Sequence, residues 1–195
     1  MGDIINYRSR RSHEETTAYV GMVIFLGSWA MLFAGLFFVY GAVRLRAPVW
    51  PPPGQGPLPV ALPAINTLVL ALSSAAMQAG LTLLRRGHTR ALAPFLGTTA
   101  ILGMVFLGLQ TVVWSRVAKA GLKPASGPYA SAFYGLTWFH ALHVGVGLIA
   151  LLWLSFRAVQ GAYSLPRHQS VRLWTMYWHF VGVVWGVMFL TVYVI

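Results

Sequence analysis

Three histidines lie inside apolar stretches of the sequence, where ionisable side chains are uncommon and are candidates for function. His140 and His143 stand three positions apart, so in a helix they would share one face, and His179 lies in a later stretch. Imidazoles in such places can ligate haem or copper, or can form hydrogen bonds that join helices. A haem-copper centre needs more ligands than these, and the chain has no cysteine. We therefore expect structural histidines, with a single bis-histidine haem as the alternative.

Two amides and a tryptophan are further candidates for contacts between helices. Gln110 lies within one apolar stretch, and Asn66 lies near the start of another. A lone amide in hydrocarbon usually forms a hydrogen bond across a helix interface, although Asn66 could instead cap its helix. Trp178, next to His179, supplies a large apolar surface. We expect all of these side chains to stabilise helix interfaces, and a transport role for Gln110 is a second hypothesis.

A basic cluster stands between the last two apolar stretches and contains Arg157, Arg167 and His168, followed by Arg172. Such a cluster can bind a phospholipid headgroup, because the planar guanidinium of arginine can donate two hydrogen bonds to one phosphate. It can also act simply as a signal for the orientation of the chain. No carboxylate side chain occurs after residue 15. We therefore expect the charge of this cluster to be unpaired within the chain.

The elements that must position these side chains follow from the composition. Of the 195 residues, 57% are hydrophobic and only 9% are charged, whereas a soluble domain usually carries about a quarter charged residues. A helix needs roughly 20 apolar residues to cross a bilayer. Five stretches meet this requirement, at about 19–43, 60–84, 92–115, 130–156 and 173–195. The sequence predicts an all-α integral membrane bundle of five transmembrane helices over residues 19–195, preceded by a polar segment at residues 1–18.

The interiors of these stretches hold many small residues, which allow helices to approach closely. Examples are Ala34, Gly35, Gly41, Ser73, Ser74, Gly80, Gly145, Gly147, Gly182 and Gly186. The two halves of the chain show no repeat, and the stretches contain no aspartate or glutamate. Proton relays and cation pathways in membranes usually rely on acidic or histidine side chains, and many transporters contain internal repeats. A proton pump or a small transporter acting alone is therefore the weaker interpretation.

The net charge of +11 comes from basic residues in short segments between the apolar stretches. This pattern is typical of loops beside a membrane and does not indicate a nucleic-acid partner. With the N-terminus inside, the outside segments carry Arg44, Arg46, Arg116, Lys119 and Lys123. The inside segments then carry Arg8, Arg10, Arg11, Arg85, Arg86, Arg90, Arg157, Arg167 and Arg172. Because basic residues tend to remain inside, this distribution predicts the N-terminus inside and the C-terminus outside.

Five collinear segments resemble motifs of subunit III of the haem-copper cytochrome oxidases. The two longest are WTMYWHFVGVVW at 174–185, similar to W-x-x-Y-W-H-F-V-D-V-V-W, and FYGLTWFHALHV at 133–144, similar to F-x-x-x-T-G-F-H-G-L-H-V. INTLVL at 65–70 is similar to L-N-T-x-x-L, and LQ at 109–110 is similar to the start of L-Q-x-x-E. VWPPPG at 49–54 is similar to W-P-P-x-G. The resemblance covers residues from about 25 to 195. It is to the last five helices of the seven-helix form, as in shorter bacterial members.

The chain departs from this family at its acidic positions. The family has a buried glutamate where this chain has Trp29, and an acid where it has Val113. Gly182 replaces an aspartate, and Arg172 aligns with an acid. Roles that the family's carboxylates play therefore cannot be carried over to this chain.

The resemblance implies an accessory subunit of a respiratory terminal oxidase in the bacterial cytoplasmic membrane. Such a subunit holds no cofactor, since haem and copper lie in partner subunits, and it packs beside oxidase subunits I and II. A small subunit IV could replace the two helices absent here. The resemblance also implies phospholipid binding, with Arg157 matching a lipid-contacting arginine and Arg167 and His168 matching a headgroup-binding pair. Alternatives are a similar component of a quinol oxidase or nitric oxide reductase complex, and an independent b-type haem protein.

Overall fold

Helices run through almost the whole computed structural model, which describes residues 2–50, 58–164 and 167–194. They are α1 (Gly2–Arg46), α2 (Ala61–Arg85), α3 (Leu92–Lys119), α4 (Pro128–Val159) and α5 (Gln169–Met188), with the short 3-10 helix η1 (Thr89–Ala91) and the π-helix η2 (Phe189–Val194), which continues α5. Five of these helices are long and apolar enough to cross a membrane. The predicted all-α bundle of five membrane helices is therefore confirmed. The proline-rich connection and its W-P-P-P-G motif fall largely at 51–57, outside the described residues.

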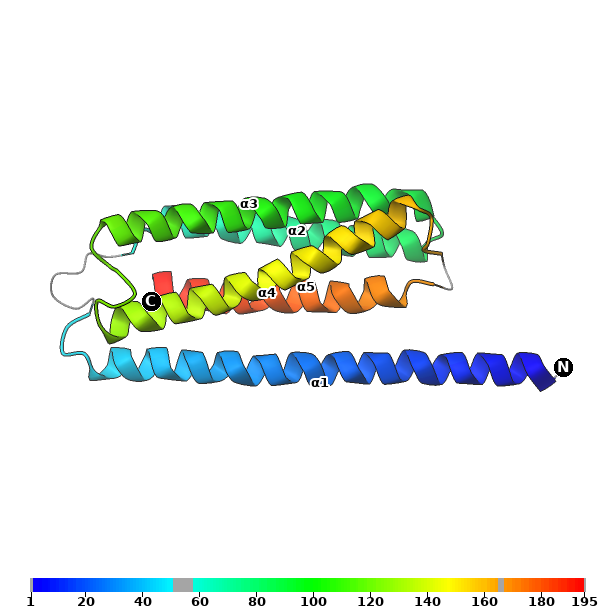
Figure 1. Ribbon diagram of the computed structural model, residues 1–195, viewed down its shortest axis with the longest axis horizontal. Coiled ribbons are helices and arrows are strands. Elements are labelled where there is room, and N and C mark those ends of the chain that lie inside the picture. The colour runs from blue at the N-terminus through cyan, green and yellow to red at the C-terminus, as the bar shows by residue number, and fades with distance from the viewer. Residues whose placement is uncertain (1, 51–57, 165–166, 195) are drawn as a thin grey trace.

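The helices extend beyond the predicted spans, and the first one does so most. At 1.5 Å per residue, the 45 residues of α1 reach about 67 Å, whereas the hydrocarbon core of a bilayer is about 30 Å thick. The polar segment at 1–18 is thus, from Gly2, the first turns of the same helix that crosses the membrane. Figure 1 shows α1 projecting past the other helices at its N-terminus. We call this the N-terminal end of the bundle; it also holds the α2–α3 turn and the α4–α5 connection.

Glycine ends two of the helices at this same end of the bundle. Gly87 after α2 and Gly161 after α4 have φ values of 89° and 71°, a left-handed conformation that suits glycine because it has no Cβ. After Gly87, the amide of His88 donates to the carbonyl of Leu83 (3.0 Å), and after Gly161 the amide of Ala162 donates to the carbonyl of Arg157 (3.1 Å). These bonds satisfy terminal carbonyls and reverse the chain toward α3 and α5.

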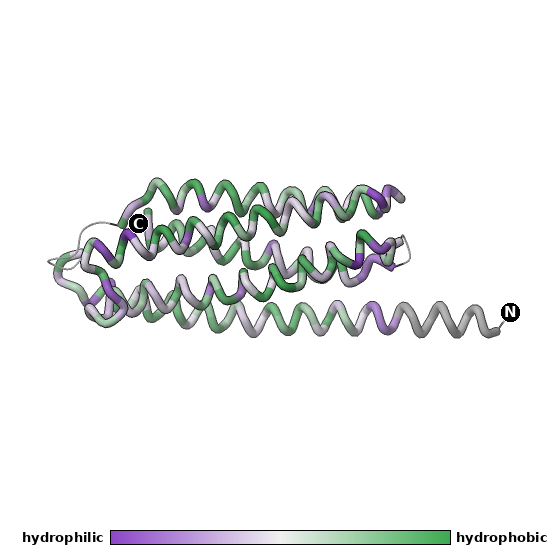
Figure 2. Tube along the Cα trace, turned by 45° about the horizontal axis from the view of Figure 1, so that its top comes forward, coloured by the Kyte–Doolittle hydropathy of each residue, from purple (hydrophilic) through white to green (hydrophobic). Residues whose placement is uncertain are grey.

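The five helices are not equally buried. α2 packs antiparallel to α3, while α4 crosses the bundle obliquely and contacts α1, α3 and α5 (Figure 1). In the most apolar part of α1 only 6% of residues are buried within the chain, against 33–44% in the other helices. Figure 2 shows apolar residues along the middle of the helices and polar ones toward their ends. α1 is therefore attached to the bundle by one face and leaves most of its apolar surface uncovered.

The core centres on the indole of Trp178, which is fully buried. Its Nε1–H donates to Ser73 Oγ of α2 (3.1 Å), and Ser73 in turn donates to the carbonyl of Thr99 in α3 (2.9 Å). Gly103 of α3 and Gly147 of α4 lie so close to the indole that a Cβ on either would come within 2.8 Å of a ring atom. Trp178 thus joins four helices at one point.

Candidate functional site

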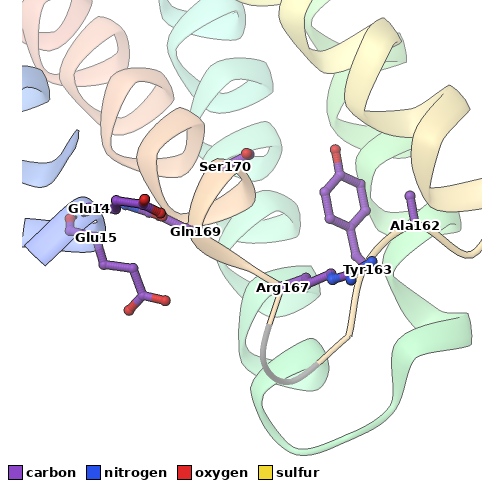
Figure 3. A pocket seen from close by; sticks show the side chains of 7 residues that line it. All are labelled: Glu14, Glu15, Ala162, Tyr163, Arg167, Gln169 and Ser170. Carbon is purple, nitrogen blue, oxygen red and sulfur yellow. Dashed lines mark hydrogen bonds between the residues drawn. The ribbon is translucent and has the colours of Figure 1, made fainter. Parts of the chain in front are cut away.

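A pocket of about 250 Å³ lies at the N-terminal end of the bundle, where α1 passes the start of α5. Its lining residues are Glu14, Glu15, Ala162, Tyr163, Arg167, Gln169 and Ser170. Figure 3 shows the two glutamates on α1 at one side of the start of α5, with Tyr163 and Arg167 of the α4–α5 connection at the other. The pocket therefore combines cationic and anionic side chains from segments about 150 residues apart in the sequence.

Two contacts fix α1 against α5 beside this pocket. The side-chain amide of Gln169 donates to the carbonyl of Glu15 (3.0 Å). One turn further along α5, the guanidinium of Arg172 lies 4.9 Å from the ring centroid of Tyr19, a distance suited to a cation–π interaction. These contacts bring the acidic turn of α1 to the level of Arg167. Nothing in the sequence indicated acids near the basic cluster, but Glu14 and Glu15 line the same pocket as Arg167, because α1 continues as a helix beyond the apolar span.

The four residues of the predicted basic cluster do not share one environment. Arg167 is exposed and lines the pocket, whereas Arg157 lies at the exposed end of α4. Both are near Tyr163: burial raises the pKa of the Tyr163 hydroxyl, and the positive charge of Arg157 acts in the opposite direction. His168 immediately precedes α5 and does not line the pocket, and Arg172 faces Tyr19. Arg167 is thus the cluster residue placed most directly to bind a ligand in the pocket.

His140 and His143 lie together on α4, on the side that faces α1 and α5. The ring of His140 is enclosed by Phe33, Phe106 and Trp185, with centroid distances of 6.4, 5.8 and 5.4 Å. Neither ring nitrogen of His140 has a hydrogen-bond partner among the described residues. Such close aromatic packing leaves no space for a porphyrin beside the imidazole. The geometry thus disfavours a haem on this histidine.

His143 combines one hydrogen bond with one close ring contact. Its Nδ1–H donates to the carbonyl of Phe139 one turn earlier (2.5 Å). Its ring centroid lies 4.0 Å from that of Trp29 in α1, in an edge-to-face arrangement. In the described part of the chain, the Nε2 of His143 and the Nε1–H of Trp29 are both buried without a hydrogen-bond partner. This contact joins α1 to α4.

His179 takes part in a separate contact on the far side of α5. Its Nε2–H donates to the side-chain oxygen of Gln78 in α2 (3.1 Å). Among the described residues, no group of three or more histidine, aspartate or glutamate side chains is arranged to hold a metal ion. The three histidines that the sequence singled out therefore form two separate helix contacts.

The predicted amide contact joins α2 to α3. The side-chain amide of Asn66 donates to the side-chain oxygen of Gln110 (3.3 Å), and both residues are fully buried. Asn66 does not cap α2, whose N-cap residue is Val60. Two polar partners were not evident in the sequence, Gln78 of His179 and Ser73 of Trp178. Ser73 carried a weak signal as one of the small residues of α2, but nothing in the sequence marked it as a hydrogen-bond partner.

The similarity to known proteins extends over nearly the whole bundle. The family model described as "Cytochrome c oxidase subunit III" matches residues 10–195. The chain belongs to the cytochrome c oxidase subunit III family.

Related proteins of this family match with similar extent. The chain is 39% identical to cytochrome c oxidase subunit 3 of Synechocystis over 90% of its own length and 74% of that protein. It is 33% identical to the protein of the same name from Thermostichus vulcanus, over 90% of the chain and 86% of the relative. The probable cytochrome c oxidase subunit 3 of Mycobacterium leprae is 34% identical over the whole chain and 96% of its own length.

The contact between Trp29 and His143 lies at one of the positions where the chain departs from the subunit III pattern. By the resemblance described above, Trp29 stands where the family pattern has a glutamate, and the structure places its ring against that of His143. An aromatic ring therefore faces the imidazole of His143 at this position. Gly182, at another acidic position of the pattern, lies beside Ser74, whose Oγ would be 3.2 Å from a Cβ. Trp29 and Gly182 therefore both contribute to the packing between helices.

Proposed function

We propose that this chain is the accessory subunit III of a haem-copper terminal oxidase, and that it contributes packing and lipid binding but no redox centre. The observation that carries this proposal is the family match over residues 10–195, together with the five membrane helices. The uncovered face of α1 and the close-packed core support a protein that completes its packing against other subunits. We propose subunits I and II as those partners, with haem and copper bound in them.

We further propose that the N-terminal end of the bundle faces the cytoplasm. This end carries the nine arginines counted above, against five basic residues at the opposite end. The tendency of basic residues to remain inside supports this orientation in a bacterial cytoplasmic membrane. The pocket containing Arg167 would then lie at the inner leaflet.

Membership in an oxidase complex predicts a specific result on purification. An affinity tag on this chain should recover oxygen-consuming haem-copper subunits in mild detergent. After dissociation of the complex, the haem absorbance should remain with the partner subunits, because His140, His143 and His179 are committed to packing within the bundle. Absorption spectra of the separated subunits provide the measurement. Stoichiometric haem on the released chain, or recovery without any haem protein, would contradict the proposal.

We propose that Arg157, Arg167 and His168 hold a phospholipid headgroup at this end of the bundle. Arg167 lines the pocket together with Tyr163, and Arg157 is close enough to act on the Tyr163 hydroxyl, so both guanidinium groups are available near a phosphate placed there. A basic residue near an anionic surface contributes about 1 kcal/mol. The two arginines together would then change lipid retention by about 30-fold, from a total of about 2 kcal/mol.

The double variant Arg157→Gln and Arg167→Gln tests this lipid site. Native mass spectrometry of the complex should show loss of at least one retained lipid, and the subunit should dissociate more readily in detergent. The matched control is Arg85→Gln with Arg86→Gln, which removes the same charge from the α2–α3 turn at the same end of the bundle. If the arginines serve only as orientation signals, a correctly inserted double variant will keep its lipid, and the proposed site is then wrong.

A further inference from the structure

The pocket at the α1–α5 junction is lined by both positive and negative side chains, whereas a site that binds only a phosphate needs no negative ones. Its charged lining residues are one cation, Arg167, and two anions, Glu14 and Glu15. One positive and two negative charges give these side chains a sum of −1. The remaining lining residues, Ala162, Tyr163, Gln169 and Ser170, add polar atoms but no charge at neutral pH. A headgroup with phosphate charge alone would thus meet attraction from one side of the pocket and repulsion from the other.

We propose that this pocket selects a phospholipid whose headgroup carries both a phosphate and a primary ammonium group, as in phosphatidylethanolamine. This inference rests on the proposed lipid site and adds a role for the two glutamates, Glu14 and Glu15, on its other side. The phosphate lies toward Arg167, and the ammonium group lies toward Glu14 and Glu15. A primary ammonium has three N–H donors, so it can form charge-assisted hydrogen bonds to carboxylates.

The contacts between the helices hold the charged side chains of the pocket in defined positions. The acidic turn of α1 is held against α5 by the bond from Gln169 to the carbonyl of Glu15 and by the stacking of Arg172 on Tyr19. Gly161 turns the chain after α4, and the amide of Arg167 donates to the carbonyl of Ser164 (2.8 Å) just before α5. Both charged halves are therefore tied to backbone that the fold holds in place.

The pocket also lies where a membrane lipid can reach it. Apolar parts of α1 and α5 continue from the level of Gln169 toward the middle of the bundle, and exposed apolar side chains such as Val20, Val23 and Ile24 follow on α1. Acyl chains can lie along this surface while the headgroup occupies the polar end. A soluble phosphoethanolamine would lack that contact. This continuity favours a membrane lipid over a free metabolite with the same headgroup.

The first test uses the intact oxidase complex without any substitution. The complex is stripped of exchangeable lipid and incubated with equal amounts of phosphatidylethanolamine, phosphatidylcholine and phosphatidylglycerol that carry acyl chains of distinguishable mass. Native mass spectrometry then identifies the lipids that stay with this subunit. We expect phosphatidylethanolamine to be retained over both competitors. Phosphatidylcholine is the sharp comparison, because its quaternary ammonium has the same charge but no N–H donor. Equal retention of all three lipids would overturn the inference.

The second test removes the acidic half of the pocket by Glu14→Gln with Glu15→Gln. The ratio of retained phosphatidylethanolamine to phosphatidylglycerol should fall by about tenfold or more, equivalent to about 1.4 kcal/mol, while the total lipid retained should stay the same. Asp3→Asn is the matched control, because it removes an acid from the same helix about 17 Å away along its axis. It should leave the ratio unchanged.

The outcomes separate this inference from the proposed lipid site on which it rests. If Arg167→Gln releases lipid and the glutamate variant keeps the wild-type ratio, the headgroup site stands and the selection of an ammonium group is wrong. If Arg167→Gln releases no lipid, the proposed site itself fails. A large change of ratio in Asp3→Asn would attribute the effect to the overall charge of α1 and would overturn the assignment of Glu14 and Glu15.

Discussion

Gly147→Ala should destabilise the subunit by about 1–3 kcal/mol, the usual cost of an added group in a close-packed core. A Cβ at this position would lie 2.8 Å from one ring atom of Trp178 and 3.1 Å from the ring of Tyr177. The indole cannot easily yield, because it is fully buried and donates to Ser73. Tyr177 is fixed as well, since its hydroxyl donates to the carbonyl of His143 (3.0 Å). The measurement is the temperature at which the subunit dissociates from the purified complex.

Gly145, two residues earlier on the same helix, provides a matched control. A Cβ at Gly145 would meet nothing within 4 Å, so Gly145→Ala should leave the dissociation temperature unchanged. The same contrast recurs on α3, where a Cβ at Gly103 would lie 2.7 Å from Leu148, while Gly108 is open. In a Trp178→Phe background the cost of Gly147→Ala should fall by more than half, because the smaller ring vacates the space. Equal costs at Gly145 and Gly147 would show that contact with Trp178 does not explain the effect.

The sequence predicted the helices well because membrane spans depend on composition alone. A run of about 20 apolar residues must form a helix in hydrocarbon, since only intrahelical hydrogen bonds can satisfy its backbone there. All five predicted stretches are helical in the described part of the chain. The reach of α1 back to Gly2 was less evident, because residues 1–18 are polar and nothing in their hydropathy distinguishes a helix from a loop.

The sequence did not predict which of the small residues pack against a neighbouring helix. Gly80, Gly147 and Gly182 lie against neighbouring helices, whereas Gly35, Gly41, Gly145 and Gly186 face open space. All of them occur in apolar helices and look alike in a sequence. The difference depends on the rotation of each helix about its axis, which is set by partners such as Trp178 and Phe95 elsewhere in the chain. Gly103, the tightest position, had no distinguishing signal.

Only the basic residues of the candidate site could be predicted from the sequence. Arg157, Arg167 and His168 were identifiable because they are close together and lie between two spans. Glu14 and Glu15 were not connected with them, since about 150 residues separate the two groups and only the packing of α1 on α5 brings them together. Similarly, the replacement of an acid by Trp29 was clear from the family pattern, but its contact with His143 depends on how α1 lies against α4.

A carboxylate placed at position 29 tests the contact between Trp29 and His143. Trp29→Glu should make the membrane part of the subunit reactive toward a membrane-soluble carbodiimide, whereas the wild-type chain should show no side-chain labelling between residues 20 and 195. The wild-type expectation follows from the absence of carboxylate side chains after residue 15. A glutamate at position 29 would lie among apolar side chains of α1 and α4, where the neutral acid is favoured, and carbodiimides react with that form. Mass spectrometry of the labelled peptides provides the measurement.

The variant Trp29→Gln provides the matched control, because it has the same shape as the glutamate and no carboxyl group, and it should not be labelled. His143 supplies the second test. Its Nε2 is buried without a partner among the described residues, whereas its Nδ1–H is already bonded to Phe139. A glutamate at position 29 would therefore share its proton with this Nε2, which slows the reaction. Adding His143→Phe to Trp29→Glu should accelerate labelling. A rate that does not respond to His143→Phe would mean that α1 does not hold residue 29 against His143 in the assembled oxidase.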